Sequence, residues 1–159
     1  MKLAGSGADV RMRLEPLEAQ ILGSALDDLL AALDEMGPGD PVWERLYPAA
    51  FSDADAADEF REMVGEDLDI ARRERLSACR AELSARPAGR RGTELALGPD
   101  ALQRWITALN DVRLALGTAL HIGPDDSPRI EPADPHAQSR AVYQWLTAVQ
   151  DGLVTHAMA

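Results

Sequence analysis

Residues Ala108 to Leu120 read ALNDVRLALGTAL, an apolar helical run that holds an amide, a carboxylate and a guanidinium within four positions. Buried polar groups cost free energy unless each finds a partner. Side chains two positions apart on a helix point to different sides, so Asp111 and Arg113 do not pair with each other. The neighbouring side chains are small or apolar on most of the circumference, which predicts a central helix packed on several sides.

Two interpretations of Asn110, Asp111 and Arg113 remain open. In the first, they form buried polar contacts that fix helix register: Asp111 reaches Arg104 or an arginine of another helix, and Asn110 reaches a neighbouring backbone. In the second, they form a partner-docking or ligand site, because perturbed charges gather at such sites. Small residues such as Gly117 let a neighbour come close, either within the subunit or at a homodimer interface.

Apolar residues recur at three- and four-residue steps along most of the chain, which is typical of helices. The sequence predicts a mainly α protein, a single-domain helical bundle of about five or six helices over residues 9–157. Gly65 is expected to kink or break the chain between two of them. The expected helices cover about 14–36, 41–47, 52–64, 66–83, 99–121 and 138–157.

Three segments lack that periodicity. Residues 1–8 are expected to be a disordered N-terminus. An Arg/Gly-rich stretch over 85–92 predicts a flexible loop, and an acidic, Pro-rich stretch over 122–136 predicts a second one. Residues 10–14 and 94–97 alternate apolar and polar side chains, which favours a small two-stranded ribbon that leans on the helices.

Composition restricts the class of protein. No segment approaches the roughly 18 consecutive apolar residues of a membrane span, and no signal peptide is recognisable, so we expect a cytoplasmic protein without membrane contact. Cys79 is the one cysteine, which excludes an intramolecular disulfide and fits a reducing compartment.

Charge is unevenly spread along the chain. Residues 15–71 hold 16 acidic residues and two arginines, a net charge of −14, whereas residues 72–91 hold seven arginines and two glutamates, a net charge of +5. A solvated helix face is one interpretation of the basic segment. The other is a contact surface for an acidic protein or, more weakly, for DNA phosphates. The candidate contact residues are Arg72, Arg73, Arg75, Arg86, Arg90 and Arg91.

A search for reaction chemistry finds no catalytic, metal-binding or cofactor-binding pattern, so we expect a protein that is not an enzyme. The histidines are scattered, and no nucleophile elbow or phosphate-binding glycine loop is present. Cys79 has two readings: a small buried hydrophobe, or a redox-reactive thiol whose pKa is lowered by flanking Arg75 and Arg80.

Several segments resemble the actinobacterial family catalogued as domain of unknown function 2017. The central motif ALNDVRLALGT, within Trp105 to Leu120, is fairly specific, and the other segments are weak alone. The resemblance spans about residues 10–155. The other matching segments are EPLEAQIL (15–22), DPV (40–42), LYP (46–48), EFR (59–61), YQWL (143–146) and Gln150.

The resemblance implies a regulator rather than an enzyme. Some members are AosR-type oxidative-stress transcriptional regulators, and genes of the family often lie beside that of the ClpS adaptor. The resemblance also implies a cytoplasmic protein that acts through protein contacts. It further implies cysteine redox switching, although Cys79 has no second cysteine to pair with. One hypothesis is docking on a sigma factor or RNA polymerase; the alternative is a helical adaptor or scaffold in Clp-linked protein quality control without nucleic-acid binding.

Overall fold

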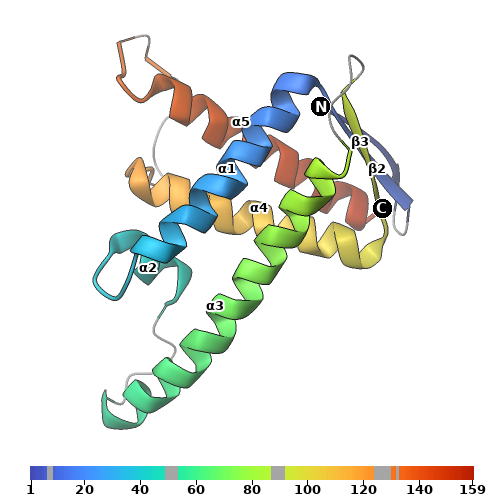
Figure 1. The fold of residues 1–159 in the computed structure, drawn as a ribbon. Helices are drawn as coiled ribbons and strands as arrows, with labels where there is room; N and C mark the ends of the chain where they lie inside the picture. The colour runs from blue at the N-terminus through green and yellow to red at the C-terminus, as the bar shows by residue number, and fades with distance from the viewer. Residues whose placement is uncertain (7–8, 49–53, 87–91, 124–129, 132) are drawn as a thin grey trace.

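Helices surround one central helix and lean on a small sheet in the computed structural model of the protein (Figure 1). The structure describes residues 1–6, 9–48, 54–86, 92–123, 130–131 and 133–159, with the backbone alone described over 54–65. Five helices and three strands lie in these ranges, so the expected mainly α architecture is confirmed.

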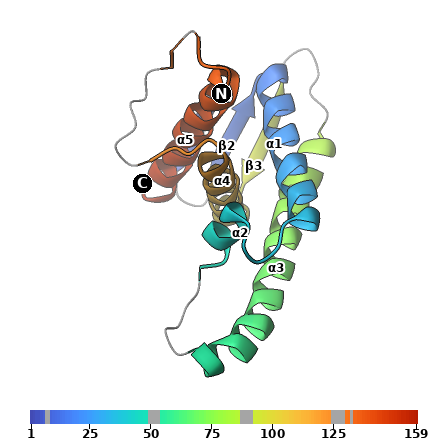
Figure 2. The same cartoon turned by 90° about the vertical axis from the view of Figure 1, so that its left-hand side faces the viewer.

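The central helix is α4 (Pro99–Ala119), which contains the ALNDVRLALGTAL motif. It contacts α1, α2, α3, α5 and β3, so it touches every other helix of the described chain. Figure 2 shows α4 nearly end-on, with α1 and α5 on either side. Leu102, Trp105, Leu109 and Val112 of α4 are buried in the shared core, as the apolar periodicity predicts.

Helix α1 (Pro16–Glu35) begins where its sequence places a start signal. Pro16 occupies the first turn, where its missing N–H is not needed. Glu15 and Glu18 form a capping box, each side chain accepting a hydrogen bond from the other residue's backbone N–H. The helix packs Leu22, Leu26, Leu29 and Leu33 inward.

Helix α3 (Ala54–Ser84) runs unbroken through Gly65, so the predicted division into two helices is wrong. A glycine inside a helix costs only about 1 kcal/mol relative to alanine, and good helix formers on both sides outweigh that cost. The C-terminal half of α3 packs on α1 and α4, and its N-terminal half extends beyond the other helices (Figure 1).

Two further helices complete the bundle. Short helix α2 (Pro41–Leu46) is capped by Asp40, whose carboxylate accepts hydrogen bonds from the N–H groups of Val42 at 2.7 Å and Trp43 at 3.2 Å. Helix α5 (Ala137–Ala157) packs along α4 and contacts the first strand.

Strands β1 (Lys2–Ser6), β2 (Asp9–Leu14) and β3 (Thr93–Leu97) form an antiparallel sheet in that order. Val10 pairs with Leu97 and Leu14 with Thr93, so the expected ribbon of 10–14 with 94–97 is confirmed. Alternate side chains of β2 and β3 enter the core, as the two-residue period predicts.

The first strand corrects the expectation of a disordered N-terminus for residues 1–6; residues 7–8 lie outside the described residues. Residues Lys2–Ser6 pair with β2, and the Met1 amino group binds the Glu18 carboxylate. The sequence of β1 shows little alternation because its side chains are mostly exposed; backbone pairing and half-buried Leu3, which lies against α5 at Gly152, order it.

The two predicted loops lie between elements. Most of 85–92 and part of 122–136 fall outside the described residues, so their predicted flexibility stays a prediction. The ends are described: α3 finishes at Ser84, Arg86 follows it, and α5 begins at Ala137.

Candidate functional site

The buried carboxylate of α4 is held by two arginines of α3. Asp111 Oδ2 lies 2.8 Å from Arg75 Nη2 and 3.3 Å from Arg72 Nε, and the Asp111 side chain is 5% exposed. The partner is therefore an arginine of another helix rather than Arg104, one of the two possibilities that the sequence left open. This contact fixes the register of α3 against α4.

Arg72 links this ion pair to α2. Its Nη2 donates a hydrogen bond to the Leu46 carbonyl at 3.0 Å, and its guanidinium carbon lies 4.4 Å from the centre of the Tyr47 ring. The Tyr47 hydroxyl donates to Asp69 of α3 at 2.5 Å. Burial and the Asp69 carboxylate raise the pKa of Tyr47 to about 12. The end of α2 is thus held by α3 through both the ring and the hydroxyl of Tyr47.

Arg113 makes the matching contacts on the other side of α4. Its Nε donates to Thr147 Oγ1 at 2.9 Å, and its Nη1 binds Gln150 Oε1. Gln150 Nε2 in turn donates to the Ile106 carbonyl of α4 at 3.3 Å. These polar groups join α4 to α5.

Gly117 provides the close approach between the same two helices. A Cβ at this position would lie 3.0 Å from Cε2 of the Tyr143 ring, closer than ordinary van der Waals contact. The Arg113 guanidinium lies 5.6 Å from the same ring centre. Asn110, the remaining polar residue of the motif, is half-buried on α4.

The basic segment is largely engaged by the chain's own acceptors. Arg73 binds Asp69 at 2.7 Å, the Leu33 carbonyl at 2.6 Å and the Asp34 carboxylate. Arg80, which the sequence analysis placed beside Cys79, binds both oxygens of Asp27 at 2.8 and 2.9 Å. The acidic α1 and the basic half of α3 therefore neutralise each other within the molecule.

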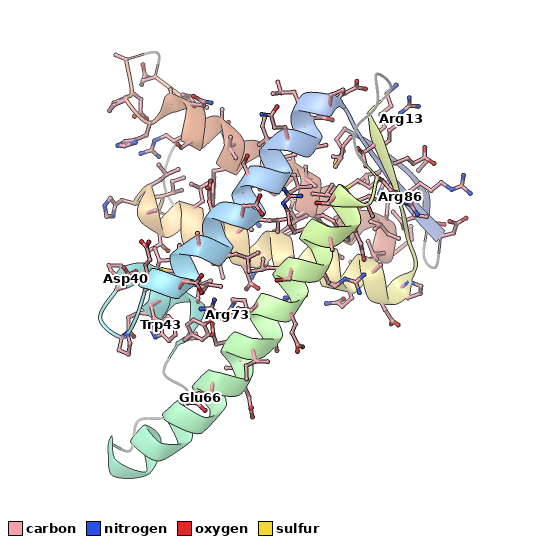
Figure 3. The ribbon with its side chains drawn as sticks, in the orientation of Figure 1. Arg13, Asp40, Trp43, Glu66, Arg73 and Arg86 are labelled. Atoms are coloured by element: carbon pink, nitrogen blue, oxygen red, sulfur yellow. The ribbon has the colours of Figure 1, made fainter. Side chains whose placement is uncertain are left out.

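The candidate contact arginines do not form one described patch. Arg73 lies where α3 passes α1, whereas Arg86 lies near the sheet and donates to the Glu94 carbonyl at 2.9 Å (Figure 3). Arg72 is buried, and Arg75 binds Asp111. Arg90 and Arg91 lie outside the described residues, so their role stays a prediction.

Cys79 lies in the core with its side chain fully buried. Burial, with a smaller contribution from Glu82, raises the pKa of the thiol to about 12, and the opposing effect of Arg104 and Arg75 is weaker. The alternative reading, a redox-reactive thiol with a pKa lowered by flanking arginines, is therefore not supported. At neutral pH the sulfur is a protonated thiol, which favours the reading of Cys79 as a small buried hydrophobe.

Glu82, beside that thiol, collects two donors of α4. Its carboxylate accepts a hydrogen bond from Trp105 Nε1 at 2.7 Å and binds Arg104. Glu82 is thus a second polar link between α3 and α4, one helical turn or more away from Asp111.

A groove that the sequence analysis missed lies between α1, α4 and α5, with a volume of about 540 Å³. Its lining is mainly apolar, and α1 contributes one whole face from Leu17 to Met36. Leu17 itself is 66% exposed. Helical periodicity marks which side chains are apolar, but it does not show that α5 leaves part of this face uncovered, so the sequence carried no signal for the groove.

The described ranges hold neither a cluster of metal-binding side chains nor a helix that could span a membrane. No group of three or more His, Cys, Asp or Glu side chains there is arranged to hold a metal ion. No helix of the same ranges is long and apolar enough to cross a membrane.

Comparison with known proteins gives a family and several relatives. The family model described as "Domain of unknown function (DUF2017)" matches residues 2–157. Proteins named "Oxidative stress regulator AosR" from Mycobacterium tuberculosis and Mycobacterium bovis are each 31% identical over 178 residues, covering 93% of this chain and 82% of the relative. The "Putative oxidative stress regulator AosR" of Mycobacterium leprae is 32% identical over 152 residues, covering 86% of this chain and 69% of the relative. No solved structure matches the chain.

Proposed function

This chain belongs to the family described as Domain of unknown function (DUF2017), and on that premise we propose that it is a cytoplasmic, non-enzymatic regulator of the oxidative-stress response. It acts through protein–protein contacts, docking on a sigma factor or RNA polymerase. The names of its mycobacterial relatives support the regulatory role.

One observation supports contact with a protein rather than with DNA: the arginines of the basic segment pair with acceptors of the same chain. Phosphate contacts supply most of the affinity of DNA-binding proteins, and those contacts need accessible cations. Arg72, Arg73, Arg75 and Arg80 face carboxylates or carbonyls of this chain. With a net charge of −11, the molecule as a whole repels a polyanion.

Affinity purification of the tagged chain from its native cell, followed by mass spectrometry, tests the proposal. We expect a sigma factor or RNA polymerase subunits among the specifically recovered proteins. Recovery of Clp components without polymerase or sigma factor would contradict this function and favour the adaptor alternative.

A gel shift at physiological salt tests the DNA part separately. We expect no shift with duplex DNA, and the same result when Arg86, Arg90 and Arg91 are replaced by alanine. A shift that disappears in the triple variant would show that DNA contact belongs to the function after all.

A further inference from the structure

The groove between α1, α4 and α5 extends along most of α1. Its lining residues run from Leu17, near the start of that helix, to Met36, the residue after its end, about 28 Å at the helical rise of 1.5 Å per residue. Helix α4 contributes Val112, Ala115, Leu116 and Ala119 to the lining, and α5 contributes Gln138, Ser139 and Val142.

The side chains in the groove leave room for large ones. The lining holds four alanines, Ala25 and Ala32 of α1 and Ala115 and Ala119 of α4. An alanine-rich apolar surface accepts bulky apolar side chains that arrive at i, i+3, i+4 and i+7, which is the spacing of an amphipathic helix. An exposed apolar surface of this kind on a polar protein is typical of a docking site.

The charge beside the groove indicates what kind of helix fits. Helix α1 carries five acidic residues, and three of them, Glu18, Asp27 and Asp34, bind cations of this chain. Asp28 is exposed and is the one ionisable side chain in the groove lining; the other polar lining groups are neutral amides and hydroxyls. A second copy packed through the same groove would bring a second Asp28 and another net charge of −11, and an anionic lipid would bring a carboxylate or phosphate with no basic lining residue to meet it.

We propose that this groove binds an amphipathic helix of a partner protein, with large apolar residues on one face and lysine or arginine along its flank beside Asp28. This inference rests on the proposed function, because it gives the docking surface for the partner. Apolar side chains of the helix fill the alanine-rich lining, and its basic flank is attracted by the exposed Asp28 carboxylate.

Binding of a synthetic peptide tests the groove directly. The probe is a fluorescent peptide of about 18 residues, roughly the length of the groove, with leucine at the i, i+3, i+4, i+7 positions and lysine elsewhere. Two control peptides have the same composition in scrambled order, or glutamate in place of lysine. Fluorescence anisotropy with the full chain should show saturable binding of the first peptide and at least tenfold weaker binding of both controls.

Pairs of α1 variants, one inside the groove and one outside it, show whether the peptide binds in the groove. Ser24→Trp fills the groove from an exposed position, and Ala31→Trp adds the same bulk at an exposed position of α1 outside it. Asp28→Lys reverses charge in the groove, and Glu35→Lys does so outside it. We expect Ser24→Trp and Asp28→Lys to weaken binding at least tenfold, and the two control variants to leave it within twofold.

Several results would overturn the proposal. They are equal binding of the lysine and glutamate peptides, equal effects of the groove and control variants, and binding of oleate to the wild-type chain that Ser24→Trp weakens at least tenfold and Ala31→Trp does not. A dimer in sedimentation that Ser24→Trp alone dissociates would instead assign the groove to a second copy of the chain.

Native-cell purification with the same variants separates this inference from the proposed function. Loss of the recovered sigma factor or polymerase in Ser24→Trp but not in Ala31→Trp supports both. If Ser24→Trp still recovers that partner, the groove is not its docking surface, and the proposed function is unaffected. Peptide binding through the groove without any transcription partner in the purification supports the groove and contradicts the function.

Discussion

Asp111 combines burial with two cationic partners, and this arrangement decides what its loss does. Arg72 and Arg75 lie close to one carboxylate, and Arg72 Nη1 and Arg75 Nε are buried without a hydrogen-bond partner among the described residues. A buried cation that loses its anion is left uncompensated, which costs far more than an exposed pair. The contact therefore stabilises one register of α3 against α4 even if its net contribution to folding is small.

Replacing Asp111 by asparagine should lower the free energy of unfolding by about 3 kcal/mol, the lower end for a broken buried pair because Arg75 is partly exposed. Urea unfolding followed by circular dichroism measures the loss. Asp27→Asn breaks the exposed pair with Arg80 and should cost less than about 1 kcal/mol. Equal losses in the two variants would show that Asp111 is not a buried lock.

Cys79 should be chemically inert while the chain is folded. Its thiol is buried and protonated at neutral pH, so an aromatic disulfide reagent at pH 8 should react with it far more slowly than in 6 M urea. Rapid reaction of the native chain would support a redox role instead, and so would a peroxide-induced change in oligomeric state that Cys79→Ser abolishes.

The raised pKa of Cys79 also gives an alkaline stability change. Between the ordinary thiol pKa near 9 and the folded value of about 12, the folded chain keeps a proton that the unfolded chain has released. Stability from this group is therefore complete below pH 9 and is lost as pH rises toward 12. Denaturant unfolding should show that the free energy of unfolding falls less between pH 8 and pH 10.5 in Cys79→Ala than in the wild-type chain. An equal fall in both chains would contradict the assignment of this pH dependence to Cys79.

At the scale of elements, α2 is too short to be stable alone and depends on what holds its end. A helix of six residues gains little from its own hydrogen bonds. Arg72 of α3 donates a hydrogen bond to the Leu46 carbonyl, and Asp69 of α3 accepts one from the Tyr47 hydroxyl. The centre of the Trp43 ring lies 4.2 Å from the centre of the Tyr47 ring. Figure 3 labels Asp40 and Trp43 on α2 and its N-cap, at this corner of the molecule.

Removal of the Tyr47 hydroxyl should loosen this corner. Tyr47→Phe keeps the ring under Arg72 but deletes the hydrogen bond to Asp69, so we expect a loss of about 1 kcal/mol. Hydrogen exchange should show faster exchange of the α2 amides, with α5 amides unchanged below the global unfolding limit. Uniform acceleration in both helices would mean that α2 does not open separately.

The elements also show what sequence patterns can predict. Apolar periodicity places α1, α4 and α5 within a few residues, because each buries a continuous stripe. The prediction of a helix break at Gly65 failed because a single glycine is a local signal, and it does not show that good helix formers on both sides continue the helix. Strand β1 is invisible to periodicity because its order comes from pairing with β2.

At the scale of the whole molecule, charge cancels across helices rather than along the chain. The sequence shows an acidic half and a basic segment, but it cannot show that Arg73 meets Asp34 or that Arg80 meets Asp27, partners 39 and 53 positions apart. Side-chain partners of the ALNDVRLALGTAL motif were equally out of reach: the motif indicates buried polar contacts, and only the packing of α3 and α5 supplies their identities.

This cancellation predicts behaviour on charged matrices. We expect the chain to pass through a heparin column at physiological salt and to be retained by an anion exchanger, because its basic segment is paired internally while its net charge is −11. Chromatography of the wild-type chain and of the Arg86, Arg90, Arg91 triple alanine variant checks this. Heparin retention that the triple variant loses would point to an open basic patch beyond the described residues.

The central position of α4 also limits how this sequence can diverge. Asp111, Arg113 and Trp105 each have their polar partner on another helix, so an acceptable change at one of them needs a simultaneous change on α3 or α5. A change at an exposed groove position such as Ser24 or Asp28 needs no simultaneous change on another helix. Over evolutionary time we therefore expect α4 to vary by compensated pairs, while the α1 face drifts one residue at a time and adapts to new partners without endangering the fold.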